Sequence, residues 1–150
     1  MKKFDYSLQP ILNIKEQKQK VEKEKLAMII SKYEIQKKKL NQIMQEINNT
    51  LLENENKTKI GTTALDIKQY SIYLDSLYNK INEQKMIISM IEKEINETKK
   101  RLKDISKEKE ALENLKEKKY DEYKYLTMLE QNLIIDEQVS FKVAKSTIGG

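Results

Sequence analysis

Apolar residues recur along two long stretches of the chain at alternating steps of four and three residues. In the first stretch, seven of the eight positions reached by these steps are apolar, and Lys37 is the exception. A period of 3.5 residues is typical of helices that wind around each other in a left-handed coiled coil. The positions of this first predicted seam are Leu26, Ile30, Tyr33, Lys37, Leu40, Met44, Ile47 and Leu51.

The second stretch is longer, and eleven of its fourteen positions are apolar. After Leu112 the apolar phase slips to Leu115 and resumes loosely, so we expect a helix there with less regular packing. The positions of the second predicted seam are Ile67, Tyr70, Leu74, Leu77, Ile81, Gln84, Ile88, Ile91, Ile95, Thr98, Leu102, Ile105, Lys109 and Leu112, followed loosely by Tyr123, Leu126 and Leu133.

The periodicity stops between the two stretches, where a polar segment from Glu53 to Thr62 contains Gly61, the only glycine before the last two residues. Glycine and polar residues between periodic segments indicate a turn. We therefore predict one helix over about residues 7–53, a turn over about 54–62, a second helix over about 63–143 and a C-terminal tail over 144–150.

Sequence signals for helix ends support both predicted starts. Thr63 followed by Asp66 has the spacing of a capping box, in which the threonine hydroxyl accepts a hydrogen bond from a free backbone N–H. Ser7 can cap the first helix and would place Pro10 in the first turn, where a missing N–H costs little. Tyr6 and Ile11 would then form a hydrophobic staple.

A chain that folds back on itself pairs positions whose numbers sum to a constant, and the two seams satisfy this rule with sums of 117 or 118. The predicted fold is therefore all-α, a single antiparallel coiled-coil hairpin of two long helices, with a stutter in the first helix near residues 22–27. The second helix would extend roughly 40 Å beyond the first. The predicted pairs are Leu51 with Ile67, Ile47 with Tyr70, Met44 with Leu74, Leu40 with Leu77, Ile30 with Ile88 and Leu26 with Ile91.

A second apolar strip flanks the predicted seam. Ile29 and Ile43 share one heptad position on the first helix, and Tyr73 and Ile87 share the same position on the second. These residues either widen the core or form a stripe on which a partner docks.

Composition removes most kinds of chemistry. The chain has 150 residues, 35% of them charged, and no cysteine or histidine, so thiolate nucleophiles, imidazole bases and the commonest zinc ligands are missing. A two-helix hairpin encloses no pocket in which a carboxylate could be desolvated. We expect neither catalysis nor a bound metal or cofactor.

Charge and hydropathy also bear on partners. Of the 29 basic residues only Arg101 is arginine, and lysine runs such as Lys37–Lys39 are typical of a solvated helix face, so we expect no nucleic-acid partner. The mean hydropathy is −0.78, and the longest apolar stretch, near Met86 to Ile91, is far shorter than the roughly 20 residues that span a bilayer. The beginning of the chain lacks the apolar core of a signal peptide, so we expect a cytoplasmic protein.

Several segments together resemble the FliJ family of the bacterial flagellar export apparatus, and the resemblance covers essentially the whole chain. Its early part is carried by Phe4-x-Tyr6-x-Leu8-Gln9-x-Ile11-Leu12 and by Tyr70-x-x-Tyr73-Leu74-x-x-Leu77. Its later part is carried by Leu112-Glu113-x-Leu115-x-Glu117-Lys118-Lys119, Glu130-Gln131 and Asp136-Glu137.

The resemblance implies a hairpin similar to the central stalk of rotary ATPases. Its implied partners are the hexameric export ATPase FliI, the cytoplasmic domain of the export gate protein FlhA, and export chaperones. Such a protein would couple ATP hydrolysis to protein export without hydrolysing ATP itself, and would meet the membrane only peripherally, through the export apparatus. Position by position, the resemblance places gate-binding residues at Tyr73, Leu77, Lys80 and Gln84, together with Ile43.

Two other functions would use the same hairpin. A central-stalk subunit of a rotary ATPase usually adds an inserted globular domain, for which this chain has no segment. A coiled-coil scaffold would present the same seam without the FliJ-like segments.

Overall fold

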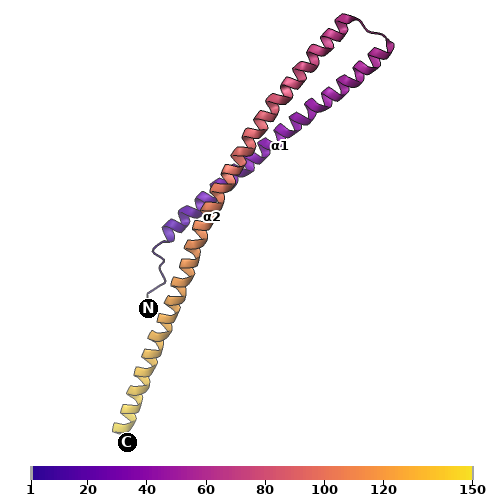
Figure 1. Cartoon of the computed structure of the whole chain (residues 1–150). Coiled ribbons are helices and arrows are strands. Elements are labelled where there is room, and N and C mark those ends of the chain that lie inside the picture. The colour runs from indigo at the N-terminus through magenta and orange to yellow at the C-terminus, as the bar shows by residue number, and fades with distance from the viewer. Residues whose placement is uncertain (1, 150) are drawn as a thin grey trace. The chain divides into compact units, whose positions relative to one another are not determined.

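A computed structural model describes residues 2–149, with the side chains of residues 2–147, so Met1 and Gly150 lie outside the described residues. The chain forms two long helices, α1 (Gln9–Ile60) and α2 (Ala64–Gly149), which are joined by a short turn and pack against each other (Figure 1). No strand occurs between residues 2 and 149. The predicted all-α helical hairpin is confirmed.

The turn is shorter than predicted. It occupies residues 61–63, because α1 continues past its predicted end near residue 53 as far as Ile60. Polar residues there do not break the helix, and the Thr58 hydroxyl donates to the Asn54 carbonyl at 2.7 Å. The helix ends at Gly61, whose φ of 119° lies in the region that only glycine adopts readily.

The predicted cap of the second helix is present, since the Thr63 hydroxyl accepts a hydrogen bond from the Asp66 backbone N–H at 3.1 Å. The first helix begins at Gln9, after a turn in which the Gln9 N–H donates to the Tyr6 carbonyl at 2.9 Å. The staple between Tyr6 and Ile11 is not formed as predicted, because Ile11 is exposed. The predicted tail from residue 144 belongs to α2.

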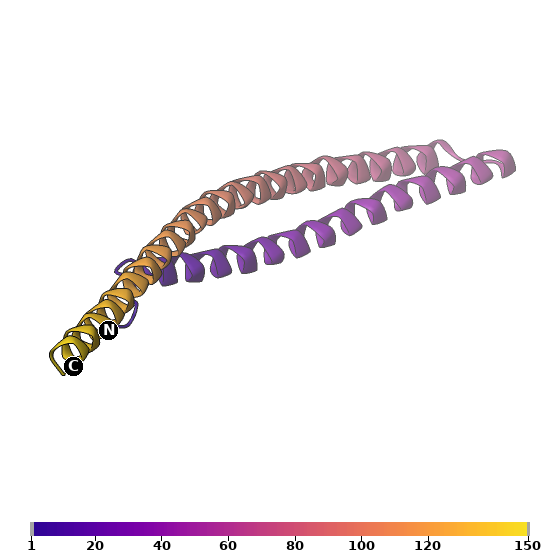
Figure 2. The same cartoon turned by 90° about the horizontal axis from the view of Figure 1, so that it is seen from below.

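The hairpin divides into two compact units. The turn unit comprises Lys20–Lys103, and the terminal unit comprises the chain up to Gln19 and from Asp104 onward. In each unit a part of α1 packs on a part of α2. In the terminal unit, the segment before α1 also runs beside α2 (Figure 1 and Figure 2).

The α2 seam follows the prediction closely. Every predicted position from Tyr70 to Leu112 is buried or half-buried, whereas Ile67, where the predicted seam begins, is exposed. Beyond Leu112 the predicted slip to Leu115 is wrong, because Leu115, Leu126 and Leu133 are exposed, whereas the predicted Tyr123 is half-buried. Lys116 and Tyr123 keep the spacing of the preceding seam, and the half-buried Thr127 lies one residue beyond the next position of that spacing.

Only alternate positions of the predicted α1 seam are correct. Leu26, Tyr33, Leu40 and Ile47 are protected, but the intervening positions are each displaced by one residue. The apolar pattern alone could not decide which of two neighbouring residues lies in the seam. Isoleucine occupies both positions 29 and 30, and apolar residues occupy both positions 43 and 44. The intervening protected residues are Ile29, Gln36, Ile43 and Thr50, whereas Ile30, Lys37, Met44 and Leu51 are exposed.

The predicted stutter near residues 22–27 is also absent. Protected positions continue at steps of three and four towards the start of α1. Several of these positions are polar, so the pattern of apolar residues did not indicate them. These positions are Leu12, Lys15, Gln19, Glu22 and Leu26.

The pairing of the two helices is displaced from the predicted register. The side-chain amide of Gln84, which is only 8% exposed, donates to the Gln36 side-chain oxygen at 2.6 Å and to the Gln36 carbonyl at 3.0 Å. These two numbers sum to 120, so the predicted sums of 117 and 118 are wrong by two or three residues. The predicted register would have placed the buried Gln84 amide opposite Tyr33 or Glu34. In the structure each glutamine meets a matching amide.

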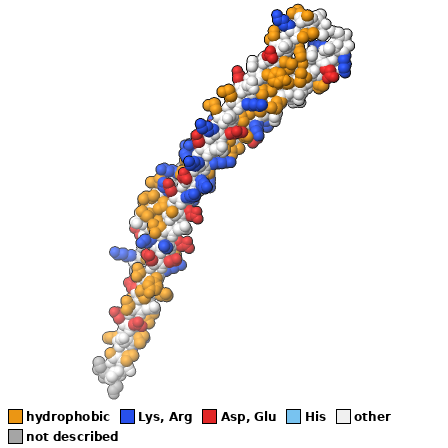
Figure 3. Space-filling model, viewed as in Figure 1, with side chains coloured by type: hydrophobic (Ala, Val, Ile, Leu, Met, Phe, Trp, Pro, Cys, Tyr) orange, Lys and Arg blue, Asp and Glu red, His pale blue; other side chains and the backbone are white. Residues whose placement is uncertain are grey.

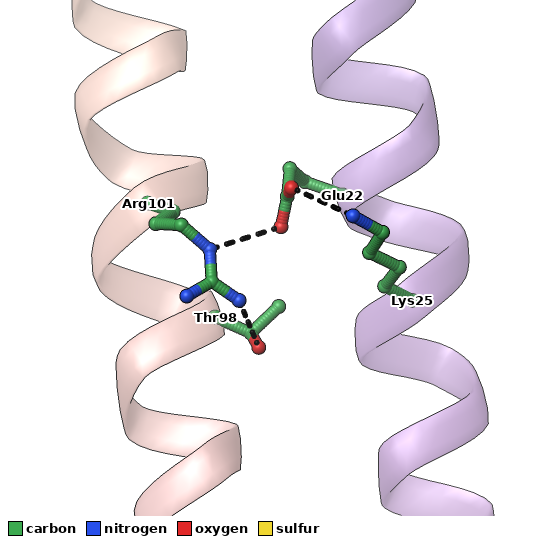
Figure 4. A network of polar contacts seen from close by, with 4 residues as sticks. All are labelled: Glu22, Lys25, Thr98 and Arg101. Atoms are coloured by element: carbon green, nitrogen blue, oxygen red, sulfur yellow. Dashed lines mark hydrogen bonds and ion pairs between the residues drawn. The ribbon is translucent and has the colours of Figure 1, made fainter.

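A second polar group lies within the turn unit, between the two helices (Figure 4). Arg101 contacts the Glu22 carboxylate at 3.5 Å and donates to the hydroxyl of the fully buried Thr98 at 3.1 Å. Lys25 pairs with the same carboxylate at 3.4 Å. Thr98 therefore has the hydrogen-bond partner that a buried hydroxyl requires.

Candidate protein-binding surfaces

The five gate-binding residues expected from the sequence lie at different depths. Leu77 is 1% exposed and Gln84 is buried in the seam, while Ile43 is half-buried. Tyr73 is 43% exposed, and Lys80 is also on the surface. A partner that contacts the closed hairpin can therefore reach Tyr73 and Lys80 directly, whereas the other three residues form the support beneath them.

Tyr73 is held in place by the opposite helix. Its hydroxyl donates a hydrogen bond to the Glu46 carboxylate. This hydrogen bond favours the neutral phenol, and with partial desolvation it raises the pKa of Tyr73 above its ordinary value. The same hydrogen bond orients the ring before any partner arrives, which lowers the entropic cost of its burial by a partner.

The predicted flanking strip separates into two groups. Ile29, only 7% exposed, and the half-buried Ile43 belong to the core. Tyr73 and Ile87 are both 43% exposed, and with Lys80 they lie at seven-residue intervals on α2. On α1 the two isoleucines are positions of the seam itself, because Ile30 and Met44 are exposed, so the core is not widened there. The α2 members remain available to a partner. We call Tyr73, Lys80 and Ile87 the flank face.

The last part of α2 packs against no other described segment. Every side chain from Met128 to Thr147 is exposed, a length of roughly 30 Å of helix, which we call the exposed end (Figure 1). It carries eight large apolar side chains, and hydrophobic side chains are visible on its surface in Figure 3. These are Met128, Leu129, Leu133, Ile134, Ile135, Val139, Phe141 and Val143.

The apolar residues of the exposed end surround the helix instead of forming one stripe. Leu133, Ile134 and Ile135 are consecutive, and consecutive residues of a helix point about 100° apart. A helix that is apolar on several sides is normally buried on those sides. The exposed end therefore has the surface of a helix that a partner encloses.

The aromatic residues before the exposed end contact the beginning of the chain. Phe4 packs edge-on against Tyr120, with ring centroids 5.2 Å apart, and lies 5.5 Å from the ring of Tyr123. The Tyr123 hydroxyl donates to the Lys2 carbonyl at 2.7 Å. The sequence pattern does not predict this contact, because residues 2–8 precede the helix and lack a helical period.

Tyr6 anchors the same segment. Its side chain is 6% exposed, and its hydroxyl donates to the Leu112 carbonyl at 2.8 Å. An open groove of about 900 Å³ remains between residues 2–8 and α2. The groove has an apolar floor and a rim of mixed charge. Its floor includes Leu8, Leu115, Tyr123 and Leu126, and its rim includes Lys2, Lys3, Asp5, Lys119, Glu122 and Glu130.

Between residues 2 and 149, no three acidic side chains gather in a way that could hold a metal ion. Over the same range, neither helix contains a segment with the length and apolar character needed to cross a membrane.

Comparison with protein families gives a match over almost the whole chain. The family model described as "Flagellar FliJ protein" matches residues 4–147. No curated protein and no solved structure shows a significant match to the chain.

Proposed function

The chain belongs to the FliJ family and is a component of the flagellar export apparatus, and from this premise we propose that it is a stalk that binds the export ATPase ring and the export gate through separate surfaces. In this proposal the protein acts at the cytoplasmic side of the cell membrane, peripherally through the apparatus. It transmits ATP hydrolysis by FliI without hydrolysing ATP itself, and it escorts export chaperones.

The exposed end is the observation that carries the ATPase assignment. Its apolar side chains point to several sides of one helix, so a flat or grooved partner would leave some of them in water. A hexameric ring offers a central channel that surrounds an inserted helix. We therefore assign the exposed end to the FliI hexamer.

The flank face is assigned to the cytoplasmic domain of FlhA. Tyr73 supplies an oriented, partly exposed aromatic ring, the residue type that most often dominates binding energy, and Lys80 lies one heptad away. The contribution of Leu77, Gln84 and Ile43 is indirect. These residues fix the spacing of the two helices beneath Tyr73 and Lys80. Substitutions at the three buried positions would change gate binding only through the fold.

Titration with both partners tests the two assignments together. We expect Ile134→Asp to weaken binding of the FliI hexamer, because it places a charge in the enclosed section, and to leave FlhA binding unchanged. Tyr73→Ala should weaken FlhA binding about thirtyfold, corresponding to roughly 2 kcal/mol, while the ATPase is still stimulated.

Tyr78→Ala is the matched control, since Tyr78 is a 48% exposed tyrosine of α2 outside both surfaces. All three variants should retain the helicity and the melting temperature of the natural chain. Equal loss of both partners in either variant would show a folding defect, and full retention of both partners by Ile134→Asp and Tyr73→Ala would refute the proposal.

A further inference from the structure

Residues 2–8, which we call the strap, are held to α2 by few interactions. Two hydrogen bonds link the described strap residues to α2, from Tyr6 to the Leu112 carbonyl and from Tyr123 to the Lys2 carbonyl. The apolar attachment is the packing of Phe4 on Tyr120 and Tyr123 and the burial of the Tyr6 side chain, which is 6% exposed. Opening the strap releases only these contacts and two hydrogen bonds, so it costs less free energy than separating the two helices.

The face under the strap runs directly into the exposed end. Beside the strap, Leu115 is 37% exposed, Tyr120 is 41% exposed and Leu126 is 59% exposed. Met128 and Leu129, the first apolar residues of the exposed end, are 56% and 41% exposed. Exposed apolar side chains therefore recur along α2 from beside the strap into the exposed end, and the strap covers only the first part of this surface.

A partner that encloses α2 would meet the strap as it advances along this surface. Phe4 lies over the rings of Tyr120 and Tyr123, so a wall around α2 at that level needs the space that Phe4 occupies. The open groove of about 900 Å³ beside Leu115 and Leu126 gives an incoming apolar side chain a place to enter before the strap leaves.

We propose that the strap is a displaceable cover whose closure competes with the enclosure of α2 by a partner. This inference rests on the proposed function, because it takes the FliI hexamer as the enclosing partner. The strap covers part of Leu112, Tyr120 and Tyr123 while α2 is free. When the partner encloses α2 beyond the exposed end, the strap leaves, and the partner covers the same residues.

If the strap competes with the partner, a change that weakens the strap should tighten partner binding. If the strap were part of the binding surface, the same change would weaken it. The apparent dissociation constant equals the intrinsic one divided by the fraction of molecules with an open strap. Phe4→Ala removes the aromatic contacts and so increases the open fraction. Because an aromatic pair contributes about two- to tenfold in an equilibrium constant, we expect FliI binding to tighten by about that factor.

Covalent closure is the sharper test, and the chain has no cysteine to interfere. Lys3 and Lys119 line the same groove from the strap and from α2, and neither belongs to the aromatic contacts. Lys3→Cys with Lys119→Cys, joined by a short bis-maleimide, should lock the strap on α2. Locking should weaken FliI binding at least tenfold, whereas the same variant capped with N-ethylmaleimide should bind as the natural chain does.

The outcomes separate this inference from the function on which it rests. If the natural chain fails to bind the FliI hexamer, the proposed function fails. If the natural chain binds, and the locked and capped proteins bind equally well, the strap does not compete and the inference is overturned. Weaker binding by Phe4→Ala would also overturn it, because the strap would then belong to the binding surface. FlhA binding, measured on the same samples, should be unchanged by locking.

Discussion

The two units of the hairpin use the same spacing of protected residues but fill it with different chemistry. In the turn unit, the seam buries Ile29, Ile47, Leu77 and Ile88 almost completely. In the terminal unit, the buried apolar side chains are Tyr6 and Leu12, and polar side chains occupy much of the rest. Removing apolar side chains from water stabilises the fold. Exposed ion pairs and hydrogen bonds contribute less, because water competes for the same polar groups. We therefore expect the turn unit to contribute most of the stability and the terminal unit to open more easily.

The polar contacts of the terminal unit show this difference directly. Gln19 donates to the Ser106 hydroxyl and accepts from the Lys109 ammonium, both at 3.0 Å. Lys15 pairs with Glu108 at 2.5 Å. Such contacts fix which residues meet, but each contributes little net free energy at a surface.

The largest effect is expected from a charge in the seam of the turn unit. Leu77 is 1% exposed, so Leu77→Asp would leave a carboxylate without water or a partner. We expect the free energy of unfolding to fall by about 3 to 5 kcal/mol, as measured by thermal and urea denaturation followed by circular dichroism. Tyr78→Asp, on the exposed neighbour, is the control and should change stability little. A small effect at Leu77 would contradict the assignment of stability to this unit.

A cavity in the terminal unit should have a smaller and more local effect. Leu12 is 2% exposed, and Leu12→Ala should cost about 2 kcal/mol, at the lower end for a buried leucine because a hollow lined by the charged Glu16 and Lys116 lies beside it. Hydrogen exchange should show faster exchange of amides in α1 before Gln19, with unchanged protection around Ile47. Leu77→Ala is the matched variant in the other unit. Loss of protection throughout the chain in Leu12→Ala would show that the two units open together.

The paired glutamines should affect register more than stability. Gln84→Ala leaves the Gln36 amide without its partner, and we expect a cost of about 1 kcal/mol. The double variant Gln36→Leu with Gln84→Leu should be at least as stable as the natural chain, because neither position then carries a polar group. It should also permit a second register, since leucines pair equally well with several neighbours. Spin labels at Gln42 and Asn79 would report one distance in the natural chain and two in the double variant.

The smallest effect concerns the Lys15–Glu108 pair. The hydrogen bond from the Lys15 ammonium, with its positive charge, lowers the pKa of Glu108 below its ordinary value. A carboxylate whose pKa is lower in the folded state stabilises the fold above the unfolded pKa, and this stabilisation is lost as the pH falls through the folded value. Glu108→Gln should therefore slightly reduce the drop in melting temperature between pH 6 and pH 3. Glu110→Gln, on the same helix, is the control, and an equal change in both variants would assign the effect to general charge.

How far the sequence could specify the fold depends on how distinct neighbouring positions are. On α2, each seam residue from Tyr70 to Leu112 was predicted, because the residues on either side are mostly charged or polar. On α1, Ile29 and Ile30 are equally apolar, so hydropathy could not choose between them. Which isoleucine enters the seam depends on the register of the two helices. That register includes the hydrogen bond from the Gln84 amide to the Gln36 side-chain oxygen, which forms only when the helices are aligned in space.

The positions of the proposed binding residues in the fold were predictable to a similar extent. Tyr73 was identified from its heptad position and from the family resemblance, and its exposure agrees with a binding role. The burial of Leu77 and Gln84 follows from the α2 seam itself, whereas the contact of Glu46 with Tyr73 depends on the true register. The strap could not be predicted, because Phe4 and Tyr6 meet residues more than 100 positions away without any repeating pattern.

The short turn at Gly61 also sets the order in which the molecule assembles. Residues on either side of it are close in sequence, so their contacts close small loops and lose little chain entropy. Once the preceding turns of helix are paired, each further contact along the hairpin orders only a few more residues and so loses little additional chain entropy. Tyr6 and Leu112, 106 residues apart, therefore meet late, and Lys2 and Tyr123, 121 residues apart, meet later still. During synthesis α1 emerges before any of α2 exists, so its apolar seam waits without a partner until the ribosome has passed Gly61, and folding then proceeds from the turn towards the two ends of the chain.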